Sequence, residues 1–166
     1  MARKSKLTRE ILISRTRILV KAYIEMIADG AGDTFAIEGL NRIVNRLGWD
    51  VNYPGLTNDS VSYYRKYAAA EFSAAAWAAH QRGAGKDELR TEHVEPQSEF
   101  TRKVADLVTN GASDDDLIKF MRKFRMVVLT MDEVKRLDKI NRSRMTPDRL
   151  AEAGIVCFVP DVAMAA

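Results

Sequence analysis

The chain has little of the side-chain chemistry that marks the common classes of enzyme. Its 166 residues include one cysteine, two histidines and four prolines, and 8% of them are aromatic. A single cysteine excludes an internal disulfide and a cysteine-cluster zinc site. Cys157 lies in an apolar run, residues 155–159, where we expect a buried and unreactive thiol.

Several motifs and long apolar runs are also missing. The sequence has no Walker phosphate loop, no dinucleotide glycine fingerprint, no internal repeat and no nucleophile-elbow pattern around a serine. Arg15, Arg17 and Lys21 interrupt the apolar stretch that follows the basic residues 3–6. We therefore expect neither a signal peptide nor a membrane span, and we expect a cytoplasmic protein.

What the chain does have is apolar residues and a mild basic excess. Hydrophobic residues make up 46% of it, enough to bury a core without disulfides, and the net charge is +3. The first 22 residues carry seven basic side chains against Glu10 alone. Arg15 and Arg17 could present a positive stripe to the phosphates of a nucleic acid, or could belong to a solvated helix face.

The spacing of apolar residues predicts a mostly helical α+β fold with a small element of two or three strands near the carboxyl end. Expected helices cover residues 7–28, 33–47, 57–82, 98–109, 114–124, 132–141 and 147–153, and Gly48 is expected to end the second. Residues 125–129 and 155–159 are expected to form two strands that pair with each other.

The clearest break in the sequence is Gly83-Ala84-Gly85-Lys86-Asp87. It predicts a boundary between a helical lobe, residues 1–82, and a mixed α/β lobe, residues 87–166. The two lobes could also form one compact domain.

The segment Thr91-Glu92-His93-Val94-Glu95-Pro96 places one of the two histidines between carboxylates. In an extended segment the side chains of His93 and Glu95 point to one face, and those of Glu92 and Val94 to the other. An imidazole beside a carboxylate can act as a general base. The alternative is that His93 only makes contacts within a loop.

This segment resembles the first strand of HNH, or histidine-metal finger, endonucleases. Residues 127–137 are similar to the second strand and helix of that finger. The resemblance implies hydrolysis of phosphodiesters with a divalent metal, Mg²⁺, Mn²⁺, Ni²⁺ or Zn²⁺. It implies Glu92 as a metal ligand and His93 as the catalytic base that deprotonates a water. Asp132 or Glu133 would complete the metal site, and Arg136 would face the phosphate.

The chain also departs from that family, since no histidine follows His93 and two expected helices interrupt the finger. It could be a divergent enzyme in which acidic residues replace the histidine ligand, or a degenerate scaffold that kept only a binding surface. Whether it is an enzyme therefore stays open.

Two further hypotheses need no catalysis. Residues 40–48 followed by 58–66 resemble a helix-turn-helix whose second helix offers Arg65 and Lys66 to DNA, but the loop of about ten residues is typical of an ordinary helix pair. The other hypothesis is a small interaction protein, such as a phage-encoded inhibitor of a host nucleic-acid machine. The expected partner is thus DNA or a complex that processes nucleic acid, and the sequence does not determine the oligomeric state.

Overall fold

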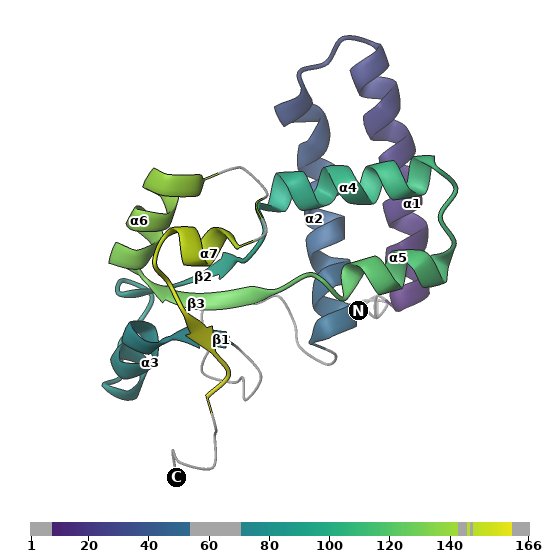
Figure 1. Cartoon of the computed structure of the whole chain (residues 1–166). Helices are drawn as coiled ribbons and strands as arrows, with labels where there is room; N and C mark the ends of the chain where they lie inside the picture. Colours follow the sequence, from purple (N-terminus) through teal and green to yellow (C-terminus); the bar gives the residue numbers. More distant parts are fainter. Residues whose placement is uncertain (1–7, 54–70, 143–145, 147, 161–166) are drawn as a thin grey trace, which may run out of the picture. The chain divides into compact units, whose positions relative to one another are not determined.

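The computed structural model describes residues 8–53, 71–142, 146 and 148–160 (Figure 1). The fold is α+β and mostly helical, with one small mixed sheet. The chain divides into two compact units, residues 1–57 with 97–124 and residues 58–96 with 125–166. Neither unit is continuous in sequence. Residues 83–87 lie inside the second unit, between α3 (Ala74–Gln81) and β2 (Leu89–His93).

The first unit contains α1 (Arg9–Ala28), α2 (Asp33–Asn52), α4 (Gln97–Thr109) and α5 (Asp114–Met121). The expected end of α1 at Ala28 is confirmed, and the helix stops before Gly30, whose φ is +85°. It begins at Arg9 and not at residue 7, because the hydroxyl of Thr8 caps it by accepting from the Ile11 amide at 3.4 Å. Its core is formed by side chains from all four helices: Leu12, Val20, Leu40, Val44, Leu47, Phe100, Val104, Leu117 and Met121.

The expected end of α2 at Gly48 is wrong, because the helix continues to Asn52. Gly48 is buried, and a Cβ atom at this position would lie 2.5 Å from the ring carbon Cγ of Phe124. The glycine therefore allows a close approach of the helix backbone to an aromatic ring. Trp49 meets the same ring edge-on, with 5.9 Å between ring centroids.

The second unit holds a four-stranded sheet of β1 (Glu71–Ser73), β2, β3 (Met126–Thr130) and β4 (Cys157–Phe158), in the order β2-β3-β1-β4. β3 is antiparallel to β2 and parallel to β1, and β4 is antiparallel to β1. The expected pairing of residues 125–129 with 155–159 is wrong, since β1 lies between them. Pairing with β3 and β4 overrides the helical propensity of the alanine-rich segment, so that α3 begins only after Ser73. The rest of that expected helix, residues 57–70, lies outside the described residues.

Helices cover both faces of β3 (Figure 1). On one face Val128 packs with Phe72, Leu89 and two alanines of α3. On the other, Val127 and Leu129 pack with side chains of α6 (Met131–Asn141), α7 (Arg149–Glu152) and the loop after it: Val134, Leu137, Leu150, Ala153 and Ile155. A strand buried on both faces explains the uninterrupted apolar run of residues 126–129.

Candidate functional site

The structure separates Glu92 and His93 from Asp132 and Glu133, the two acids that the resemblance implied would complete the metal site. β2 and β3 are antiparallel, so His93 lies opposite the first residue of β3, while the first residue of β2 lies opposite Thr130. Asp132 and Glu133 follow Thr130 and are therefore at the other end of the strand pair from Glu92 and His93. A five-residue strand is about 17 Å long. The predicted assembly of these residues around one ion is not found.

Glu133 has a structural role in the first turn of α6. Its Oε2 atom accepts from the Thr130 amide at 2.9 Å, the Thr130 hydroxyl at 3.1 Å and the Ser73 hydroxyl at 2.6 Å. The Thr130 hydroxyl in turn accepts from the Glu133 amide, which completes a capping box. Asp132 points into solvent and pairs with Lys135 at 3.3 Å.

The last turns of α6, and not its first, meet the end of β2 that carries Glu92 and His93. The contact is made by Arg149, which is buried. Its guanidinium donates to the carbonyl of Asn141, the last residue of α6, at 2.7 Å and to the carbonyl of His93 at 2.9 Å. A cation at this position also complements the C-terminal end of the helix dipole. Sequence reasoning missed this residue, although it lies within the helix expected over residues 147–153.

Glu92 has three charged neighbours, Arg90, Arg149 and Asp138, and none of them was identified from the sequence. It pairs with Arg90 at 2.8 Å. Burial raises the pKa of its carboxyl group, and the charge of Asp138 on α6 raises it further, while Arg90 and Arg149 act in the opposite direction. Asp138 was not included in the expected site, because the resemblance implied only acids of the first turn of α6.

His93 is an uncharged imidazole at neutral pH. Burial lowers its pKa to about 4, and the charge of Arg149 contributes to the shift. As neighbours on a strand, Glu92 and His93 point to opposite faces of the sheet. Two such side chains do not converge on one ion. Throughout the described part of the chain, no group of three or more His, Cys, Asp or Glu side chains could hold a metal. The divalent metal that the resemblance implies thus does not fit these residues.

The predicted nucleic-acid contacts have different surroundings. Arg17 is bound to Asp114 at 2.6 Å and to the carbonyl of Ala112 at 2.8 Å, which fixes α1 to the start of α5. Arg136 is exposed, and its Nε donates to the carbonyl of Ala153 at 2.8 Å. Arg15 is exposed. Arg65 and Lys66 lie outside the described residues, as does the second helix of the expected helix-turn-helix.

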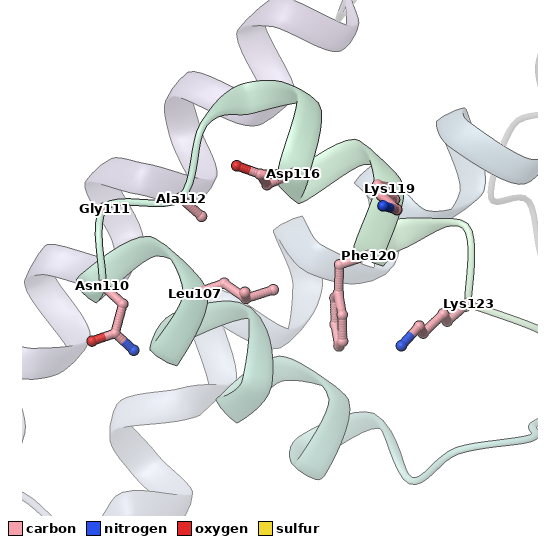
Figure 2. A pocket seen from close by; sticks show the side chains of 8 residues that line it. All are labelled: Leu107, Asn110, Gly111, Ala112, Asp116, Lys119, Phe120 and Lys123. Atoms are coloured by element: carbon pink, nitrogen blue, oxygen red, sulfur yellow. The ribbon is translucent and has the colours of Figure 1, made fainter.

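The first unit contains a hollow that sequence reasoning missed, with a volume of about 500 Å³ between α4 and α5 (Figure 2). The two helices are joined by a turn at Gly111, whose φ is +78°, and α5 begins with a capping box between Ser113 and Asp116. The side chains that line the hollow include Leu107, Asn110, Asp116, Lys119, Phe120 and Lys123. The signal was available in the sequence, since Lys119 and Lys123 are one helical turn apart on either side of an aromatic residue.

Comparison with known proteins provides no family for this chain: no family model matches it, and neither a curated protein nor a solved structure matches it. Within the described ranges, no helix is both long enough and apolar enough to cross a membrane.

Proposed function

We propose that the chain binds nucleic acid and does not cleave it. The observation that supports this proposal is a group of three exposed basic side chains on α5 and just after it, Lys119, Arg122 and Lys123. Within the described residues, none of them belongs to an ion pair. Arg9 and Arg17 of α1, by contrast, are bound to carboxylates of their own unit.

Exposed basic groups that are not neutralised within the protein can replace the counterions of a phosphate backbone, and the release of those counterions favours binding. Cations near a helix C-terminus also complement the helix dipole. The interaction with the helix dipole leaves the three side chains exposed, so they can still contact phosphates.

The part of the proposal that excludes cleavage rests on the second unit. Glu133 uses one carboxylate oxygen to bind three donors, and Arg149 is the cation that bonds to the backbone beside Glu92. The acids and the imidazole that would have to act together are at opposite ends of a strand pair.

The binding test is fluorescence anisotropy with labelled DNA and RNA oligonucleotides over a series of salt concentrations. We expect affinity to fall as salt rises. A triple variant, Lys119→Gln with Arg122→Gln and Lys123→Gln, should reduce the slope of log K against log salt by about 2 to 3, since each phosphate contact contributes about 0.7 to 0.9. The control is Lys135→Gln, an exposed lysine of α6. Absence of salt-dependent binding, or equal slopes in both variants, would contradict the proposal.

The cleavage test uses supercoiled plasmid incubated with the protein and Mg²⁺, Mn²⁺, Ni²⁺ or Zn²⁺ in turn. We expect the plasmid to stay intact in each case. Nicking that disappears in a His93→Ala variant would show a hydrolase and refute this part of the proposal.

A further inference from the structure

We infer that the hollow between α4 and α5 accepts an unpaired nucleobase, so that the protein prefers single strands to duplexes. This inference rests on the proposed function and names the substrate class of the same surface. It depends on the combination, in one hollow, of an aromatic ring with two lysines (Figure 2).

The aromatic ring of the hollow is held in place from behind. Phe120 stacks on the buried Phe100, with 4.9 Å between centroids and an interplanar angle of 29°. Phe120 itself is partly exposed and lines the hollow together with Leu107 of α4. A fixed ring with an accessible surface can stack against a base of any sequence, because every base has a π face.

The two ends of the hollow differ in charge. Lys119 and Lys123 lie at the Phe120 end, and the Nζ atom of Lys123 lies over the Phe120 ring, 5.5 Å from its centre, so that a stacked base would displace this flexible side chain. Asp116 and Asn110 lie away from Lys123 (Figure 2). The Oδ2 atom of Asp116 accepts from the amide and the hydroxyl of Ser113, and these bonds lower the pKa of the carboxyl group and keep it ionised at this end of the hollow. A phosphate is therefore favoured at the lysine end, beside a base on the ring.

The size and polarity of the hollow favour a nucleotide over other acidic ligands. A volume of about 500 Å³ falls within the range of small-ligand sites and can admit a base with its sugar. An acidic peptide would also meet the lysines, but extended peptides are bound through backbone hydrogen bonds along a sheet edge or in a long groove. Among the described residues that line the hollow, Asn110 has the one uncharged polar side chain. In a duplex the bases are paired and stacked, and cannot reach the ring.

The test measures the affinities of a labelled single strand and of its duplex for the wild-type protein and for Phe120→Leu, which keeps an apolar group but removes the ring. We expect tighter binding of the single strand, and a loss of about 5- to 150-fold for Phe120→Leu with the single strand alone. Phe120→Trp should retain the affinity. The control is Phe35→Leu, at an exposed aromatic residue of α2, and thermal unfolding verifies that each variant folds.

The outcomes separate this inference from the proposed function. Equal binding of single strand and duplex, unchanged by Phe120→Leu, would overturn the inference and leave nucleic-acid binding intact. No binding of either form would overturn both. Both would also be overturned if the protein bound a peptide of glutamate and phenylalanine through Phe120 and bound no nucleic acid.

Discussion

The hydroxyl of Ser73 donates a 2.6 Å hydrogen bond to Oε2 of Glu133, and this bond joins β1 to the first turn of α6. Ser73 and Thr130 end two parallel strands, and each caps the helix that follows. The carboxylate of Glu133 therefore lies where two helices begin, and the positive ends of their dipoles stabilise a negative charge there. An acid that the resemblance implied as a metal ligand thus accepts hydrogen bonds that join a strand to a helix.

We expect Glu133→Ala to lower the free energy of unfolding by roughly 2–4 kcal/mol, because it removes the acceptor of one buried and two partly buried donors together with a helix cap. Urea denaturation measures the effect. Asp132→Ala is the matched control in the same turn, and it should cost less than about 0.5 kcal/mol, since its ion pair with Lys135 is exposed. Equal losses in the two variants would contradict the structural role of Glu133.

Two glycines of α2 should respond to alanine in opposite directions. Gly48→Ala would place a methyl group against the Phe124 ring and should destabilise the protein by about 1–3 kcal/mol. Gly39→Ala meets no atom within 4 Å and should stabilise the helix by up to about 1 kcal/mol. Thermal unfolding measures the two changes in stability. A neutral Gly48→Ala would show that Phe124 moves aside easily.

The half-buried imidazole of His93 should make stability depend on pH. Its pKa is about 4 in the folded protein against an ordinary value of 6.5, so its contribution is fully present above pH 6.5. As the pH falls from 6.5 towards 4, only the unfolded chain takes up the proton, and stability falls by up to roughly 3 kcal/mol. Urea denaturation between about pH 7 and pH 5 should show a smaller loss for His93→Gln than for the wild type.

The comparison with His93→Gln is needed because Glu92 acts in the opposite sense. Its pKa is raised in the folded state, so acidification favours the folded form through this group. An identical pH dependence in the wild type and in His93→Gln would show that the imidazole is solvated.

Cys157, which the sequence predicted to be buried, is half-buried at the end of the sheet, and its thiol should react slowly in the folded protein. Burial raises the pKa of its thiol to about 12, and the charges of Glu71 and Glu133 contribute. Only the thiolate reacts readily, so at pH 8 we expect a disulfide reagent to modify the native protein at least about 100-fold more slowly than the urea-unfolded chain. Rapid modification without unfolding would contradict the raised pKa.

Predictions from local patterns agree with the structure where the determining interactions are themselves local. The end of α1 at Ala28, the end of α4 at Thr109 and the start of α5 at Asp114 agree with the expected ranges, and each lies within a few positions of a capping residue or a glycine. The buried strand at residues 126–130 follows from its apolar run. These features depend on contacts between near neighbours in the sequence.

The misplaced features all depend on partners far apart in the sequence. Whether residues 71–73 form a helix or a strand is decided by their pairing with residues 127–128 and 157–158. The predicted grouping of site residues is absent for the same reason: the antiparallel register separates His93 from Glu133, while Arg149 donates to the carbonyl of His93. The hollow beside Phe120 could not be predicted without knowing that α4 and α5 lie next to each other.

The sequence by itself determined a mostly helical α+β chain, the positions of most of its helices, a buried β3 and a mild basic excess, because periodicity, capping and charge are properties of short segments. Only the tertiary structure decided the strand order, the role of Glu133, the contact between Arg149 and the end of β2, and the hollow on α5. Each of these is a contact between segments whose separation along the chain carries no information about their distance in space.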